Sequence, residues 1–141
     1  MNFDKMNSAG YLVNHMARLF AKGLQDRIAP VGMVIGQFPI LLELWARDGI
    51  TQKQLVAKLD IEQATIANTL NRMERDKLIK RTAHPGDARA QQIWLTNKAK
   101  AMRSPAFAAA MQQNELALSK LSPEERMQFM KSMRVIIDTM R

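Results

Sequence analysis

The chain has 141 residues and a formal net charge of +8, with 47% hydrophobic and 6% aromatic residues, 11 methionines and no cysteine. This length fits one globular domain, and the composition favours a mostly helical interior filled by aliphatic and methionine side chains. The lack of cysteine excludes disulfides, thiolate redox sensing and thiolate metal ligands.

The sequence pattern shows neither a membrane-spanning helix nor a secretory signal. No apolar run approaches the roughly 20 residues that a membrane-spanning helix requires. The first thirty residues lack the basic start, apolar stretch and small-residue cleavage site of a secretory signal. We therefore expect a cytoplasmic protein that has no membrane partner.

The first third of the chain predicts two amphipathic helices. Residues 9–29 carry apolar side chains at intervals of three or four, and Pro30 ends this pattern. A second apolar pattern covers residues 37–48, where Pro39 is compatible only with the first turn, since its missing N–H would have no helical partner there. The stripe of the first helix consists of Leu12, Met16, Leu19, Phe20, Leu24 and Ile28.

The next segment has the spacing of a helix-turn-helix. Thr51 and Gln54 predict a capping box, in which each side chain bonds the other residue's backbone N–H, ahead of a short helix over residues 52–58. After a tight break, residues 62–76 predict a longer helix. A short helix, a brief turn and a longer helix are what a helix-turn-helix requires.

The longer helix separates an apolar face from a polar one. Ile66, Leu70 and Met73 share one side at the helical period. Thr and Asn on the outer arc can bond base edges, Ala can meet a thymine methyl group, and Arg can bind phosphate or guanine. An ordinary surface helix is also polar outside, so this pattern alone leaves both interpretations open. The candidate DNA contacts here are Gln63, Ala64, Thr65, Asn68, Arg72 and Arg75.

The segment that follows predicts a β-hairpin with a basic tip. The β-like runs Leu78–Ala83 and Gln91–Leu95 flank the breaker-rich turn His84–Ala90. In a winged helix, an Arg at such a tip, here Arg89, can enter the minor groove beside the recognition helix. Asp87 can hold that side chain by a charge-assisted hydrogen bond. Taken by itself, this pair favours an ordinary salt bridge in a turn.

Positive charge is concentrated in this part of the chain. From Arg72 to Arg103 there are nine Lys or Arg residues and three acidic residues, which gives +6 of the total of +8. A polyanion is the natural partner of such a cluster, because neutralising phosphates releases counterions. Lys98 stands at the start of a helix that Thr96 can cap, where a cation opposes the helix dipole and is better explained by nearby phosphate. A solvated basic surface is the alternative.

The C-terminal third predicts further helices and a partner chain. Pro105 predicts either a kink or a break ahead of an alanine-rich helix, and Ser122 starts the last helix as its cap. The last helix has an apolar surface too broad for one shallow groove, which indicates a second chain. The alternative is a monomer in which this helix packs on residues 9–29. Its apolar residues are Met127, Phe129, Met130, Met133, Ile136, Ile137 and Met140.

Residues 37–102 resemble the MarR family of dimeric bacterial transcription regulators. The most specific pieces are DARA at 87–90, IWLT at 93–96 and the helix over residues 37–44 ahead of Thr51. The resemblance implies a mostly α fold with a small β-hairpin wing in a single domain, residues 1–141. It implies a winged helix-turn-helix lobe over about residues 36–100 and dimerisation helices over about residues 8–30 and 104–141.

The resemblance also implies a function and its partners. We expect a homodimeric, sequence-specific repressor that binds double-stranded DNA at a pseudo-palindromic operator. The family commonly binds small aromatic or anionic molecules between the dimerisation helices and the DNA-binding lobe, which would release the operator. The candidate pocket residues are Tyr11, His15, Arg18, Phe38 and Trp45, for which ordinary core and surface roles are the alternative.

Three positions depart from the family pattern. Lys77 and Ala99 stand where Gly is frequent, and Ala88 stands where the wing often has a second Arg. Catalysis is not expected: His15 and His84 are the only histidines, and the chain has no metal-ligand spacing, phosphate loop or serine nucleophile motif. We expect no metal and no cofactor. A protein-interaction adaptor, whose basic face binds an acidic partner, is the alternative function.

Overall fold

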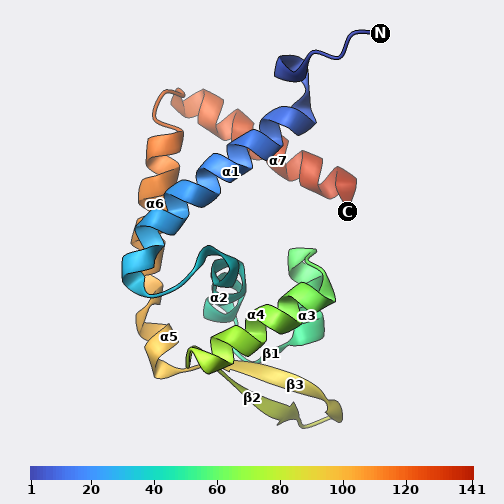
Figure 1. Ribbon diagram of the computed structural model, residues 1–141, viewed down its shortest axis with the longest axis vertical. Helices are drawn as coiled ribbons and strands as arrows, with labels where there is room; N and C mark the ends of the chain where they lie inside the picture. The colour runs from blue at the N-terminus through green and yellow to red at the C-terminus, as the bar shows by residue number, and fades with distance from the viewer.

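Two groups of elements make up the computed structural model, which describes residues 1–141 (Figure 1). The terminal helices α1, α6 and α7 lie at one end, and α2, α3, α4 and a small sheet lie at the other. The elements are η1 (Lys5–Asn7), α1 (Ala9–Ile28), η2 (Ala29–Val31), η3 (Ile35–Gln37), α2 (Phe38–Ala46), β1 (Ile50–Thr51), α3 (Gln52–Leu59), α4 (Gln63–Arg75), β2 (Ile79–His84), β3 (Asp87–Leu95), α5 (Asn97–Ala101), α6 (Arg103–Ala117) and α7 (Pro123–Met140). The predicted fold class is confirmed.

Three helices begin at the capping residues that the sequence predicts. Thr51 and Gln54 form the predicted box at the start of α3, and Ser122 forms a second box with Glu125 at the start of α7. Thr96 caps α5 by accepting a hydrogen bond from the Ala99 amide. These caps satisfy backbone N–H groups that have no partner inside a helix.

Of the two alternatives for Pro105, the break is the one observed. The chain leaves α5 at Met102 and continues as α6, with Pro105 inside the first turn of the new helix. A proline in the first turn removes no helical hydrogen bond, so α6 continues without a break through this residue. The basic helix start and the alanine-rich helix are thus two separate elements.

The hydrophobic core lies under the helix-turn-helix and the sheet. The apolar face of α4 is fully buried, with Ile66, Leu70 and Met73 at most 1% exposed. They pack with buried side chains of α2 and the sheet, together with Leu55 of α3. The tight packing of these residues fixes the rotation of α4 about its axis. Its polar face is therefore directed outward.

The sheet is larger than the predicted hairpin. Three antiparallel strands lie in the order β1, β3, β2, and Ile50 of β1 pairs with Ile93 of β3. Strand β3 begins at Asp87, four residues before the predicted start at Gln91, so the turn shortens to two residues. A bulge between Ala83 and His84 accompanies this tight turn.

Trp94 covers the loop that precedes β1. Its indole N–H donates to the Thr82 hydroxyl over 2.9 Å. Gly49, at φ +76°, lies directly under the ring, and a Cβ there would come within 2.5 Å of the indole. Only glycine fits both this backbone angle and this close approach.

Helix α7 contributes nothing to the core of its own chain. None of its residues is buried, and six large apolar side chains are more than 40% exposed. The stripe of α1 is divided, since Ile28 is fully buried whereas Leu12 and Leu19 are 41% and 59% exposed. The exposed residues of α7 are Met127, Met130, Val135, Ile136, Ile137 and Met140.

No single helix is both long and apolar enough to cross a bilayer. Only Ala9–Val31 and Ile35–Ala46 taken together reach the required apolar content, and they are bent by 92° at the break between them. No group of three or more His, Asp or Glu side chains is arranged to hold a metal ion.

Replacing Lys77 with Gly is expected to stabilise the fold by about 1 kcal/mol, because Lys77 adopts the left-handed backbone region at φ +62°. Its N–H bonds Glu74 O at 3.1 Å and that of Leu78 bonds Met73 O at 2.9 Å, the pattern that ends a helix with glycine at this position. Urea unfolding at fixed protein concentration measures the gain. Lys77→Ala keeps the strain and should show no gain; an equal gain would mean that the lysine charge, not the backbone, is unfavourable.

Candidate nucleic-acid interface

Helix α4 presents an uninterrupted polar face to solvent. Asp60, at φ +54°, turns the chain between α3 and α4, and the buried stripe of α4 leaves its opposite side free. All six contact residues predicted on this helix are exposed: Gln63, Ala64, Thr65, Asn68, Arg72 and Arg75. Asn68 lies near the centre of this face, directly opposite the stripe, at the helical period.

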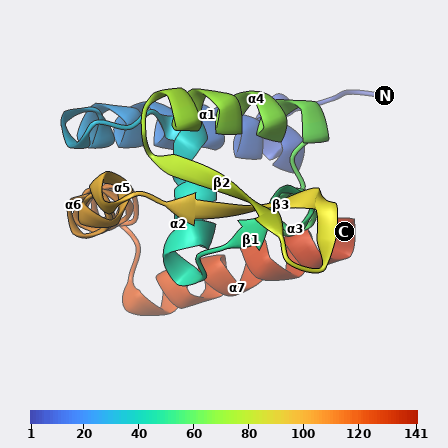
Figure 2. The same cartoon turned by 90° about the horizontal axis from the view of Figure 1, so that it is seen from below.

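The hairpin is held against α4 by Arg81, a residue that the sequence pattern did not single out. Its Nη2 donates to Asn71 Oδ1 over 2.8 Å, and its Nε lies 3.9 Å from Glu74 Oε2. Its side chain is only 17% exposed, although it belongs to a basic cluster. Seen from below, α4 and the hairpin lie on the same side of the molecule (Figure 2). Arg81 is therefore part of the support of the interface and not a free cation.

The tip of the hairpin has the predicted carboxylate and guanidinium contact. Asp87 Oδ1 accepts from the Arg89 backbone N–H over 3.0 Å and lies 3.4 Å from Arg89 Nε. The Arg89 side chain is 94% exposed, so its charge remains available to a phosphate or a minor groove. His84 supports the turn, because its Nδ1 accepts from the Gly86 N–H over 2.9 Å.

A hollow of about 570 Å³ separates this tip from the start of α3. Gln63 of α4, Arg89 of the tip and Lys53 of α3 all line it. Lys53 was not among the predicted contacts, although its place in the first turn of the helix before α4 was a usable signal. The three elements of the interface thus meet around one concave surface.

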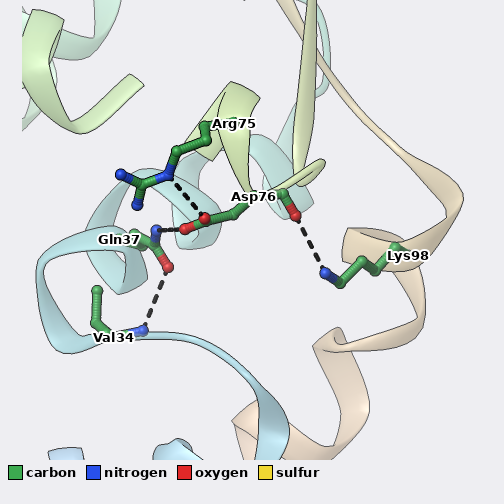
Figure 3. A network of polar contacts seen from close by, with 5 residues as sticks. All are labelled: Val34, Gln37, Arg75, Asp76 and Lys98. Atoms are coloured by element: carbon green, nitrogen blue, oxygen red, sulfur yellow. Dashed lines mark hydrogen bonds and ion pairs between the residues drawn. The ribbon is translucent and has the colours of Figure 1, made fainter. Parts of the chain in front are cut away.

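The last turn of α4 forms a polar cluster with two other elements (Figure 3). Asp76 accepts from Arg75 Nε over 3.2 Å and from Gln37 Nε2 over 3.1 Å, and its carbonyl oxygen accepts from Lys98 Nζ over 3.1 Å. Gln37 in turn accepts from the Val34 N–H. Two predicted DNA contacts, Arg75 and Lys98, are therefore hydrogen-bonded within the protein, whereas Arg72 has no such partner in the structure.

The charged form of Asp76 is favoured by its surroundings. The hydrogen bond from Gln37 and, next, that from Arg75 lower the pKa of Asp76 below its ordinary value of 3.8. The folded state then binds fewer protons than the unfolded state in this range, so stability rises with pH. This contribution is complete above about pH 5, where the unfolded carboxyl is fully ionised, and is lost as the pH falls through the folded pKa.

Asp76→Asn is accordingly expected to flatten the acid end of the stability profile. Its stability relative to the parent should be lowest above about pH 5 and should approach that of the parent as the pH falls through the lowered pKa of Asp76. Urea unfolding of both proteins at a series of pH values measures the difference. A constant difference at all pH values would show that the charge of Asp76 does not contribute.

The five predicted pocket residues do not come together in the single chain. Phe38 and Trp45 are in edge-to-face contact, with ring centroids 6.3 Å apart. Tyr11 and His15 contact each other on α1 at 6.2 Å. At the helical period, these two and Arg18 lie on one side of α1, opposite the side that faces α2 and α6. Of the five, Phe38 lines the apolar groove described next and Trp45 lies behind it, whereas the pocket assignment of Tyr11, His15 and Arg18 stays a prediction.

An apolar groove of about 640 Å³ lies between α1, α2 and α6. Phe38 lines it, and Trp45 supports its wall through Phe107 at 5.6 Å. Gln113 of α6, 8% exposed, also lines it; its Oε1 has no partner, and its amide packs where a Cβ on Gly23 would lie. No lysine, arginine or histidine lines the groove. The lining is Ala17, Phe20, Ala21, Leu24, Ile35, Phe38, Pro39, Leu42, Phe107, Ala110, Met111, Gln113 and Asn114.

This combination of helix-turn-helix, hairpin and basic surface defines a winged-helix DNA-binding protein. The family model for the MarR family matches residues 35–90, which cover the helix-turn-helix and the tip of the wing. Among curated relatives, the transcriptional regulator HosA of Escherichia coli O111:H- is 29% identical over 102 residues, 72% of this chain and 76% of HosA. The HTH-type transcriptional repressor NicR of Pseudomonas putida is 24% identical over 137 residues, 97% of this chain and 87% of NicR.

Solved structures share the whole fold. A MarR transcriptional regulator from Methanosarcina mazei is 25% identical with a TM-score of 0.85, covering 92% of this chain and 94% of that one. MepR of S. aureus, solved as a DNA complex, is 23% identical with a TM-score of 0.85 and coverages of 94% and 98%. PcaV of Streptomyces coelicolor, solved with its natural ligand, is 19% identical with a TM-score of 0.87 and coverages of 100% and 99%.

The chain has the winged-helix fold of the MarR family and is similar to the DNA-binding transcriptional regulators of that family. None of these findings tests the individual contact residues on α4, the hairpin or α5. Those assignments stay predictions, for which the structure provides exposure and position.

Proposed function

We propose that the protein acts as a homodimeric repressor that binds a pseudo-palindromic operator and is released by a small aromatic molecule. The observation that carries this proposal is the polar face of α4, exposed beside the basic tip of the hairpin while its opposite face is locked in the core. The name of NicR as a repressor and the DNA complex of MepR support it by analogy. Its place of action would be the cytoplasm, where it would meet DNA.

Dimerisation is supported by the surface of α7. An 18-residue helix that buries none of its residues, yet exposes six large apolar side chains, has no stable role in a monomer. Leu12 and Leu19 of α1 are also exposed, and α1 lies at the same end of the molecule as α7 (Figure 1). A two-fold axis through these terminal helices would bury both sets against their copies.

A dimer also answers the need for specificity. One recognition helix reads few base pairs, whereas two related by a two-fold axis read half-sites about one helical turn, or roughly 34 Å, apart. Arg72 is the unpaired cation of α4, and Arg89 reaches outward from the hairpin. Lys53 adds a positive charge at the start of α3. These side chains would bind phosphates on both sides of the helix that reads the bases.

The apolar groove is the place we propose for the effector. Its aromatic and aliphatic lining fits a planar apolar molecule, and the unpartnered Gln113 amide offers one polar contact. Because no cationic side chain lines it, the groove of the single chain favours an aromatic ligand over an anionic one. PcaV was solved with its natural ligand, which supports an effector by analogy only.

Selection of bound fragments from sheared genomic DNA tests this function. The purified protein should enrich a motif with two inverted half-sites, and gel titration of that motif should show one dimer bound. Enrichment without symmetry would remove the dimer from the proposal. If no motif were enriched, and DNA binding varied with salt but not with sequence, the adaptor that binds an acidic protein partner would be favoured instead.

A further inference from the structure

The short helix η3 stands between the apolar groove and the end of α4. Ile35, the first residue of η3, and Phe38, which follows η3, line the groove. Gln37, which directly precedes Phe38, does not line the groove and reaches Asp76 (Figure 3). One turn of chain thus contacts both the proposed effector site and the last turn of the recognition helix.

Gln37 is held by hydrogen bonds at both ends of its amide. Its Oε1 accepts from the Val34 N–H over 3.2 Å and its Nε2 donates to Asp76 Oδ2 over 3.1 Å. The next backbone amide, Ile35 N–H, donates to Gln25 Oε1 of α1 over 2.8 Å. These contacts connect α1, η3 and the end of α4 in one series of polar groups.

The burial of Gln37 makes this connection stiff. The residue is only 3% exposed, so water cannot replace a partner that its amide gives up. A displacement of η3 that broke either bond would leave a buried polar group unsatisfied. The amide is therefore expected to carry Asp76 with it when η3 moves, and to remain bonded to it.

Asp76 is where such a movement would reach the DNA-binding surface. Its N–H caps α4 by donating to Arg72 O over 2.8 Å, and its carboxylate holds Arg75. Its carbonyl oxygen accepts from Lys98 at the start of α5. A shift of this single residue changes the position of three predicted phosphate-binding cations.

We propose that Gln37 is a positioning residue through which the content of the apolar groove sets the end of α4, and thereby the affinity for operator DNA. This inference rests on the proposed function of α4 as the reading helix and of the groove as the effector site. The ligand side is Ile35 and Phe38, and the DNA side is Asp76 with Arg72, Arg75 and Lys98.

The lack of cysteine allows a test that needs no knowledge of the effector. Met111 lines the groove and is 70% exposed, so Met111→Cys can be modified with benzyl methanethiosulfonate to place a phenyl group at its mouth. Gln112→Cys is the matched control, since Gln112 is exposed and does not line the groove. Reduction with dithiothreitol removes the benzyl group and should restore the starting affinity.

The measured quantity is the operator Kd with and without the benzyl group. We expect benzylation of Met111→Cys to weaken binding about tenfold, a typical coupling between two sites, and that of Gln112→Cys to change it less than about twofold. Adding Asp76→Ala, which removes the acceptor for Gln37, should abolish the benzyl effect. Adding Asp76→Asn, which keeps an oxygen acceptor, should preserve it.

Gln37→Met, which keeps the side-chain length and removes both bonds, should also abolish the effect if the variant folds. An equal benzyl effect in Met111→Cys with and without Asp76→Ala would overturn the role of Gln37. So would the absence of any benzyl effect in Met111→Cys alone. Failure of the proposed function looks different, because the unmodified protein would then show no preference for the selected operator.

Discussion

Ile137→Asp is expected to convert the protein to a monomer and to remove operator binding at concentrations where the parent is saturated. Ile137 lies on the apolar side of α7 and is 54% exposed in the single chain. In the proposed two-fold interface, an aspartate there would be buried without a partner in both copies. The effective penalty for burying an unpaired ion is several kcal/mol, and the symmetry doubles it.

Sedimentation velocity over a range of protein concentrations measures the state of assembly, and operator titration is run on the same samples. Thr139→Asp is the matched control, because Thr139 is exposed, lies toward the other side of α7 and undergoes the same change of charge. The control should remain dimeric and should bind DNA. An Ile137→Asp protein that sediments as a dimer would contradict the interface. A parent that stays a folded monomer at all concentrations would restore the alternative in which α7 packs on its own chain.

Features that depend on a few neighbouring residues could be predicted from the sequence. Thr51 with Gln54 and Ser122 with Glu125 are capping boxes in the structure as the residue types require. The buried stripe of α4 also follows directly from its helical period. In these cases the backbone geometry that satisfies a local pattern is nearly unique. Tertiary packing then imposes no further condition on these local structures.

Features that depend on distant residues could not be predicted in this way. Strand β1 has two residues, which is too short for an alternating pattern, and it exists only because β3 pairs with it. The hydrogen bond from Lys98 to the Asp76 carbonyl joins residues 22 positions apart, and Gln37 reaches Asp76 across 39. No periodicity encodes such contacts. The internal hydrogen bond of Lys98 could not be predicted for this reason.

The direction in which Tyr11, His15 and Arg18 point from α1 could be predicted from the sequence. The same helical period that places Phe20 and Leu24 in the apolar stripe places Tyr11, His15 and Arg18 on the opposite side of the helix. The structure agrees with the stripe, since Phe20 and Leu24 line the groove. The assignment of Tyr11, His15 and Arg18 to a ligand pocket stays a prediction.

Asn68→Ala is expected to reduce the preference for the selected operator over a randomised sequence. The expected loss is about 1–3 kcal/mol for each bidentate contact between Asn68 and a base. Asn68 is exposed at the centre of the outer face of α4, and an amide side chain can bond both the N6 and N7 positions of adenine. Because alanine removes these hydrogen bonds without changing charge, binding to random DNA should hardly change. Discrimination between sequences, measured by competition at constant salt, should therefore fall while the salt dependence stays the same.

Arg89→Ala provides the opposite pattern and is the matched comparison. Arg89 is 94% exposed at the hairpin tip, and no second arginine stands beside it, since residue 88 is alanine. Removing one phosphate-binding cation from each half of a dimer should reduce the magnitude of the negative slope of log K against log salt by about 2. It should weaken binding to the operator and to random DNA alike. Arg89→Lys should retain most of the slope, since it retains the charge. If Asn68→Ala changed the slope while Arg89→Ala changed only the discrimination, the roles assigned to α4 and the hairpin would have to be exchanged. An unchanged Arg89→Ala protein would leave phosphate binding to Arg72 of α4 and Lys53 of α3, both of which are exposed.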